Sequence, residues 1–210
     1  RSVASRSHAS ASAAFGLAAN VGATLVRFDT LADAHLPSVD ALVIGGGFPE
    51  LYARELEANA PLRNRIRSAI DAGLPVYAEC GGLMYLARSL TVAGQSSRMV
   101  GAIPGDVVMR DKPVGRGYVV LEETAAFPWP AAGGERTVRA HEFHYASLEN
   151  LAPVFPAAGR EVSAAAALAA QELHGLGDDL GRVLLLPFLV RPFAGLQAPL
   201  DVDRAALVQV

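Results

Sequence analysis

The chain has 210 residues, of which 51% are hydrophobic and 19% are charged, and its formal net charge is −3. These values are typical of a packed globular domain and exclude the low-hydrophobicity, high-charge composition of disordered chains. The 18 basic residues are scattered without a basic run, which argues against a nucleic-acid partner, and no apolar stretch is long enough to span a bilayer. We therefore expect a cytoplasmic enzyme or binding domain.

The first half of the chain alternates apolar strands with glycine turns and helical segments. Residues 1–22 are rich in Ser, Ala and Arg and show no period, so they stay poorly specified. Residues 23–31 predict a short strand, and residues 38–47 predict a second strand that runs into a glycine loop. Residues 49–73 predict a helix that stops at Gly73, because glycine is common where helices end.

Residues 74–82 predict another short strand, which ends abruptly in Cys-Gly-Gly, and residues 83–90 return to a helical spacing of Leu83, Leu86 and Leu90. This order is typical of an α/β domain with a mostly parallel, doubly wound sheet and helices on both faces. Ligands bind such sheets at the carboxyl ends of the strands, and both glycine clusters fall at such ends.

The second half of the chain is less regular. Residues 99–124 are strand-like and predict antiparallel additions to the sheet, residues 124–135 predict a surface loop, and residues 136–151 predict a strand with polar residues on both faces. We assign no element beyond Arg160. The expected organisation is a poorly specified segment (1–22), a core domain (23–156) and a C-terminal segment of different character (157–210).

Cys80 is the only cysteine, so neither an intrachain disulfide nor a four-thiolate zinc site is possible. It is either a buried apolar filler or a working thiolate. Its position between a strand and a helix favours the thiolate, because such a turn exposes the side chain and aims the first N–H groups of the helix at it. The N–H of Gly81 and the loop at Gly46 and Gly47 can then hold an oxyanion, and Gly82 leaves room for a substrate amide.

Three segments carry a family resemblance: GGGFPELYARELEAN (45–59), GLPVYAECGGLMYL (73–86) and HEFHY (141–145). They resemble the class I glutamine amidotransferase domain of cobyrinate (hydrogenobyrinate) a,c-diamide synthases, over about Ala23 to Leu151. The resemblance implies a flavodoxin-like class I amidotransferase fold. It also implies that Cys80 attacks the side-chain amide of glutamine, forms a γ-glutamyl thioester and releases ammonia.

Further polar residues belong to the resembling segments. Glu50 and Glu79 either position the backbone near the nucleophile or are ordinary exposed carboxylates. In a strand, alternation places His141 and Tyr145 on one face and Glu142 with His144 on the other. The Glu142 and His144 pair is a candidate to bind glutamine or corrin carboxylates, with a purely structural role as the alternative; no metal is expected, because no third ligand has suitable spacing.

The chain departs from the family in its ATP-binding capacity. The resemblance implies an ATP-dependent synthetase domain with a phosphate-binding lysine loop, but the only lysine here, Lys112, lies in RDKPVG. We therefore expect no cofactor in this chain, and ATP with Mg²⁺ on a separate synthetase domain. The implied activity is that of an ATP-dependent carbon–nitrogen ligase of which this chain is the glutaminase part. The expected partners are glutamine, cobyrinic or hydrogenobyrinic acid, the synthetase domain and, as one option, a second copy of the chain.

The second departure concerns the base that activates Cys80. The family carries a histidine near the end of the domain, whereas residues 184–196 read LLLPFLVRPFAGL, and His174 stands in a different setting. Three explanations stay open: a shifted reading frame in the tail, another histidine in its place, or lost activity. The rival functions are a non-catalytic remnant, an amidotransferase for another tetrapyrrole, and a different cysteine hydrolase on the same fold.

Overall fold

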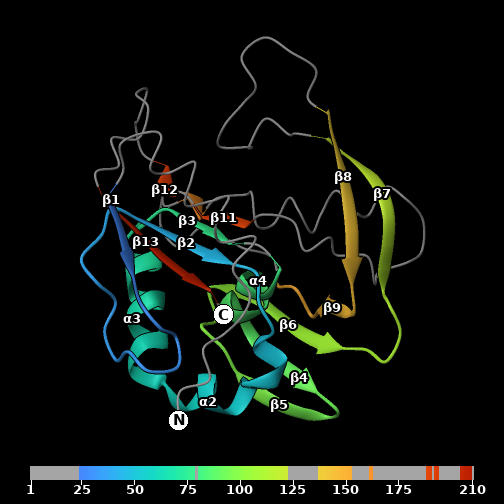
Figure 1. Ribbon diagram of the computed structural model, residues 1–210, viewed down its shortest axis with the longest axis horizontal. Coiled ribbons are helices and arrows are strands. Elements are labelled where there is room, and N and C mark those ends of the chain that lie inside the picture. The colour runs from blue at the N-terminus through green and yellow to red at the C-terminus, as the bar shows by residue number, and fades with distance from the viewer. Residues whose placement is uncertain are drawn as a thin grey trace.

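The computed structural model describes residues 24–78, 80–122, 137–152, 161–162, 188–190, 192–193 and 204–209 (Figure 1). Its first sheet has the strand order β1-β13-β2-β3-β11. The strands are β1 (Thr24–Arg27), β2 (Ala41–Gly45), β3 (Val76–Ala78), β11 (Phe188–Val190) and β13 (Arg204–Gln209). The first four in spatial order run parallel, and β11 pairs antiparallel with β3. This mixed sheet with helices agrees with the α/β class that the sequence predicts, and it gathers four carboxyl strand ends at one edge.

The segment expected as one helix over 49–73 is divided into three. It forms η1 (Pro49–Leu51), α2 (Ala53–Ala58) and α3 (Ala60–Asp71). The break before α3 follows from Pro61, which lies in the first turn of α3 and has no N–H to donate to the carbonyl four residues earlier, so that a continuous helix would lose a hydrogen bond there. Asn59 ends α2 and caps α3, since its side chain accepts a hydrogen bond of 3.5 Å from the N–H of Leu62.

The end of α3 matches the sequence prediction. Gly73 has φ 110°, and its N–H donates to the carbonyl of Ile70 at 2.9 Å. The N–H of Leu74 donates to the carbonyl of Ala69, also at 2.9 Å. These two bonds form a Schellman motif, in which glycine is favoured because it adopts a positive φ without strain. The motif turns the chain directly into β3.

The core joins α3 to the first sheet and to α4 (Gly81–Leu86). Leu62, Ile66 and Ile70 recur once per turn on α3 and are buried against Leu42 and Ile44 of β2 in the same cluster. Every residue of α4 is buried as well. The strand end and the helix that flank Cys80 are therefore both fixed by packing.

Residues 83–90 do not form the single helix that their leucine spacing predicts. The chain turns extended at Ala87 and continues as β4 (Ala87–Val92). Leu90 is fully buried there too, so a four-residue spacing of leucines was compatible with either element. β4 gains partners on both sides, antiparallel β5 (Gln95–Arg98) and parallel β6 (Ile103–Met109). Pairing of its backbone with these strands outweighs local helix preference.

The middle of the chain builds a separate four-stranded sheet rather than additions to the first one. Its order is β5-β4-β6-β9, with β5 (Gln95–Arg98), β6 (Ile103–Met109) and β9 (Ala146–Glu149). The residues expected as one strand over 136–151 form β8 (Thr137–His144) and β9, with a break at Tyr145. β8 pairs antiparallel with β7 (Gly115–Glu122), from Gly115 opposite His144 to Glu122 opposite Thr137.

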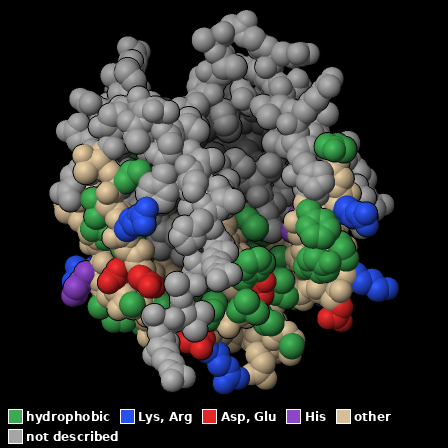
Figure 2. Space-filling view, viewed as in Figure 1, with side chains coloured by type: hydrophobic (Ala, Val, Ile, Leu, Met, Phe, Trp, Pro, Cys, Tyr) green, Lys and Arg blue, Asp and Glu red, His purple; other side chains and the backbone are tan. Residues whose placement is uncertain are grey.

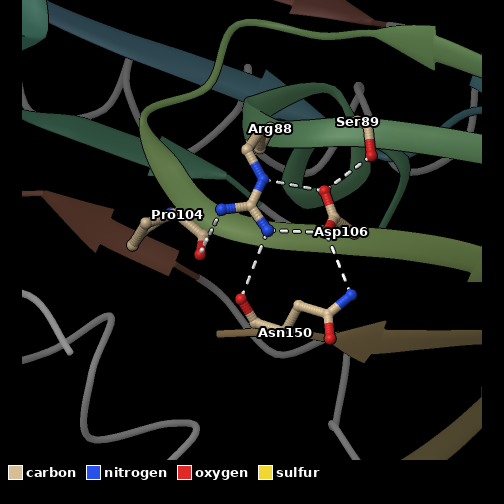
Figure 3. A network of polar contacts seen from close by, with 5 residues as sticks. All are labelled: Arg88, Ser89, Pro104, Asp106 and Asn150. Carbon is tan, nitrogen blue, oxygen red and sulfur yellow. Dashed lines mark hydrogen bonds and ion pairs between the residues drawn. The ribbon is translucent and has the colours of Figure 1, made fainter. Parts of the chain in front are cut away.

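A network of polar contacts holds the second sheet together (Figure 3). Arg88 on β4 binds both carboxylate oxygens of Asp106 on β6, from Nε at 2.9 Å and from Nη2 at 2.5 Å. Ser89 donates to the same carboxylate at 2.7 Å, and the Asn150 side chain donates at 3.2 Å. The bond from Arg88, with those from Ser89 and Asn150, holds the pKa of Asp106 well below its usual value although partial desolvation opposes the effect.

The C-terminal segment contributes strands where the sequence predicts none. β13 lies inside the first sheet, with Leu207 opposite Val43 of β2 and opposite Arg27 of β1. β10 (Glu161–Val162) and β12 (Pro192–Phe193) form a small antiparallel pair. The loop expected over 124–135 and the segment 1–22 lie outside the described residues. No helix in the described part of the chain is long and apolar enough to cross a membrane.

Candidate active site

Cys80 lies at the turn from β3 into α4, with φ 50° and ψ −116°. A non-glycine residue in this region carries about 1–3 kcal/mol of backbone strain, which persists only where the surroundings impose it. The surroundings do so here, since α4 is buried and the N–H groups of Leu83 and Met84 donate to the Cys80 carbonyl at 3.1 and 3.2 Å. The Cys80 side chain is exposed, so it is not a filler of the core. A strained strand-to-helix turn with an exposed thiol is the geometry that a nucleophile needs.

The glycine loop after β2 lies directly against this turn. A Cβ atom added to Gly46 would lie 3.3 Å from Cβ of Cys80 and 3.8 Å from its Sγ. A Cβ atom added to Gly81 would lie 2.7 Å from the carbonyl oxygen of Gly47 and 2.8 Å from its nitrogen. Gly47 and Gly81 are 34 residues apart in the sequence. The fold therefore brings the two glycine clusters together beside the thiol. Side chains at these positions would separate them.

The contact brings backbone nitrogen atoms close to Cys80. Gly81 is the first residue of α4, where a helix leaves N–H groups without intrahelical acceptors. The nitrogen of Gly47 lies beside Gly81. Two neighbouring N–H groups next to an exposed thiol suit the stabilisation of an oxyanion that forms when the thiolate attacks a carbonyl carbon.

Gly82 packs closely against the end of β2. A Cβ atom added to Gly82 would lie 2.4 Å from the carbonyl oxygen of Ile44 and 2.9 Å from its Cγ2. Gly82 is buried, so the absence of its side chain lets α4 approach the end of β2. The expected room for a substrate amide stays a prediction. The approach fixes the position of the turn that carries Cys80.

The structure describes one of the two acidic candidates, Glu50. Glu50 is half-buried in η1, and burial raises the pKa of its carboxyl above the usual value, an effect that a backbone hydrogen bond at Glu50 partly offsets. Glu79, immediately before the nucleophile, lies outside the described residues. Among the residues described, no three His, Cys, Asp or Glu side chains converge on a position that suits a metal ion.

The HEFHY residues lie on β8 and just after it, in a different sheet from Cys80 (Figure 1). His144 is buried, and its Nδ1 lies 2.8 Å from the carbonyl oxygen of Ala146. Tyr145 packs edge-to-face against Phe143, with 5.6 Å between the ring centroids. The side chains of His141 and Glu142 lie outside the described part of the structure, so the expected pairing of Glu142 with His144 stays a prediction.

Sequence reasoning passed over the residues that surround the glycine loop. Pro49 is fully buried, and its Cδ lies 2.9 Å from the position of a Cβ on Gly81. Phe48, Leu51 and Tyr52 are exposed by 61%, 69% and 46%. Together with Pro49 and Glu50 they make up the turn of residues 48–52. Backbone hydrogen bonds from the N–H of Leu51 to the carbonyl of Phe48 and from the N–H of Tyr52 to the carbonyl of Pro49 hold this turn. The GGGFPEL segment was the one signal that pointed to them.

Comparison with known proteins decides the family. Residues 15–175 match the family described as the CobB/CobQ-like glutamine amidotransferase domain. The chain belongs to this family. It is a glutamine amidotransferase domain, as its sequence predicts, and the match includes Cys80 together with both glycine clusters.

This CobB/CobQ-like domain is also similar to curated proteins named cobyrinate a,c-diamide synthase. The protein from Magnetococcus marinus is 43% identical over 130 residues, which cover 62% of this chain and 27% of the relative. The protein from Streptococcus sanguinis is 45% identical over 60% of this chain and 27% of its own length. The one from Archaeoglobus fulgidus is 46% identical over 59% of this chain and 26% of its own length. The chain thus spans about a quarter of the length of these relatives.

Proposed function

We propose that this domain is the glutaminase part of an ATP-dependent amide-forming enzyme, and that Cys80 is its nucleophile. The observation that carries the proposal is the strained, exposed turn of Cys80 (φ 50°) in contact with the loop of Gly46 and Gly47. The proposed fold is the doubly wound, flavodoxin-like arrangement of class I amidotransferases, with the site at the carboxyl edge of the parallel strands.

In the proposed reaction, the Cys80 thiolate adds to the side-chain amide carbon of glutamine. The carbonyl oxygen takes the negative charge and accepts hydrogen bonds from the N–H groups of Gly47 and Gly81. When the intermediate collapses, the carbon–nitrogen bond breaks, the nitrogen takes a proton and ammonia leaves. The γ-glutamyl thioester that stays on Cys80 is then hydrolysed by water to glutamate, which frees the thiol.

The ammonia is proposed to amidate carboxylates of cobyrinate or hydrogenobyrinate, because the similar proteins are named cobyrinate a,c-diamide synthase. Activation of those carboxylates is assigned to a synthetase domain that binds ATP and Mg²⁺ and corresponds to the part of the relatives that this chain does not cover. This chain itself is proposed to hold no cofactor. A homodimer of the assembled enzyme and a cytoplasmic location complete the proposal.

The test is covalent trapping with 6-diazo-5-oxo-norleucine, a glutamine-like electrophile, followed by intact mass measurement and peptide mapping. We expect one adduct on Cys80 that forms more slowly when free glutamine is added. Cys80→Ala, which removes little volume, is the matched control and should give no adduct. A folded protein without any adduct would support the non-catalytic remnant instead. Modification of Cys80 that glutamine does not slow would indicate a different cysteine hydrolase.

A further inference from the structure

The β7–β8 hairpin presents one buried face and one exposed face. Gly115 and His144, which are paired across the two strands, are buried. Their neighbours Arg116 and Phe143, paired one position further along, are exposed, and so is Tyr118. Because side chains alternate along a strand and cross-strand partners share a face, these three side chains stand on the same side of the hairpin.

Aromatic rings dominate this exposed face. Tyr118 is exposed by 92% and Phe143 by 57%, and Tyr145, exposed by 39%, continues the row past the end of β8. Phe143 and Tyr145 are held edge-to-face, with an angle of 88° between the rings. Figure 2 shows hydrophobic side chains gathered on the side of the molecule where Figure 1 draws the hairpin, with Lys and Arg side chains beside them. We call Arg116, Tyr118, Phe143 and Tyr145 the hairpin platform.

The platform also carries a positive charge. Arg116 lies opposite Phe143 in the strand register and forms no ion pair within the described residues. The chain as a whole has a net charge of −3. The platform therefore offers an anionic ligand a cation beside aromatic rings that can pack against its apolar parts.

From this combination we infer that the hairpin platform binds the acceptor of the amidation, a partly conjugated macrocycle that bears carboxylates. The inference rests on the proposed function and adds the acceptor's contact to it. Aromatic side chains bury apolar surface against a macrocycle and its alkyl substituents, and a guanidinium pairs with carboxylates in two-pronged geometry. The name cobyrinate in the relatives denotes a ligand of this class, a corrin with free carboxylates.

The experiment uses the full 210-residue chain and cobyrinic acid as the probe. Binding is followed by equilibrium dialysis with the visible absorbance of the corrin. We expect saturable binding that weakens about tenfold in Arg116→Gln and in Tyr118→Ser, since each loses one charged or stacking contact. The fully esterified corrin, which has no carboxylates, should bind more weakly and should not distinguish Arg116→Gln from the unmodified chain.

Leu31→Ser is the control, because Leu31 is an exposed large hydrophobic residue (42%) outside both the hairpin and the candidate active site. Its affinity for cobyrinic acid should equal that of the unmodified chain. Far-ultraviolet circular dichroism and thermal melting of each variant check that the exposed substitutions leave the fold intact.

The inference is overturned if the folded chain does not bind cobyrinic acid, or if the platform variants and Leu31→Ser bind it equally. Loss of binding to the synthetase domain in the same variants, without any affinity for the corrin, would make the platform a protein interface and would also overturn it. The trapping experiment at Cys80 is independent. If Cys80 is trapped but the corrin does not bind, only the inference about the platform is refuted. If the corrin binds but Cys80 is not trapped, only the proposed glutaminase activity is refuted.

Discussion

Gly82 of α4 and Ile44 of β2 lie closer together than any side chain at position 82 would allow. The position of a Cβ on Gly82 is 2.4 Å from the Ile44 carbonyl oxygen, which belongs to the backbone and cannot move aside as a flexible side chain would. This contact joins the end of β2 to the start of α4. The same two elements carry the glycine loop and Cys80, so the contact sets the geometry of the candidate active site.

Gly82→Ala should therefore destabilise the domain by about 1–3 kcal/mol, the usual effect of overpacking. It should also slow the trapping of Cys80, because α4 must shift away from β2. Urea denaturation and the labelling rate measure the two effects. Gly46→Ala is the comparison: its added Cβ would lie 3.3 Å from Cβ of Cys80, so we expect little loss of stability but clearly slower labelling. Equal stability of Gly82→Ala and the unmodified chain would contradict the contact.

Replacement of Cys80 by glycine should remove the thiol and relieve the backbone strain at φ 50°. Relief of the strain should stabilise the fold by about 1–3 kcal/mol. The larger entropy of glycine in the unfolded chain offsets part of this, so we expect Cys80→Gly to be more stable than Cys80→Ala by about 1 kcal/mol. Ala93→Gly, at φ 49° in an exposed turn, is the reference for the same relief away from the site. The Ala93→Gly protein should react with 6-diazo-5-oxo-norleucine at Cys80 as fast as the unmodified chain. A Cys80→Gly protein that is less stable than Cys80→Ala would show that the turn is not strained.

Arg63 is buried, and its guanidinium donates to the carbonyls of Leu56, Glu57 and Met99 at 3.1, 2.7 and 3.0 Å. Arg63→Met keeps most of the volume but leaves these carbonyls without their charged donor, so we expect a loss of roughly 2–4 kcal/mol. The free energy of unfolding in urea gives the value. Arg65→Met, on the exposed side of the same helix, should change it by less than about 0.5 kcal/mol. Similar effects of the two substitutions would rule out the structural role of Arg63.

Asp106 should make stability depend on pH. Its pKa is held below the usual value in the fold, chiefly by Arg88, so its contribution is present above the unfolded pKa of about 4 and declines as the pH falls toward the folded pKa. Asp106→Asn should therefore lower the melting temperature at pH 7 and narrow the difference from the unmodified chain at pH 3. Asp71→Asn, which removes an exposed pair with Arg67 within α3, should have a smaller effect at both pH values. A difference that grows at low pH would refute the assignment.

Features fixed by a few neighbouring residues could be predicted from the sequence. The helix end at Gly73 and the turn at Cys80 depend on backbone preferences and on hydrogen bonds between residues at most five apart. The strand before Gly45 was visible as a short run of apolar and β-branched residues. The sequence motifs in the same region indicated the amidotransferase family, and the comparison with known proteins confirms it. Local chemistry therefore determined the kind of site and its place on the chain.

The tertiary structure decided what depends on residues far apart. Leu90 satisfies a helical spacing, but pairing of β4 with β5 and β6 makes it part of a strand. β13 lies between β1 and β2 although more than 150 residues separate Gln209 from Gly45, its partner in the register. The contact of Gly82 with Ile44 likewise has no local signal. A sequence records which residues prefer to turn or to be buried, whereas the partner that buries them is set by the packing of the whole chain.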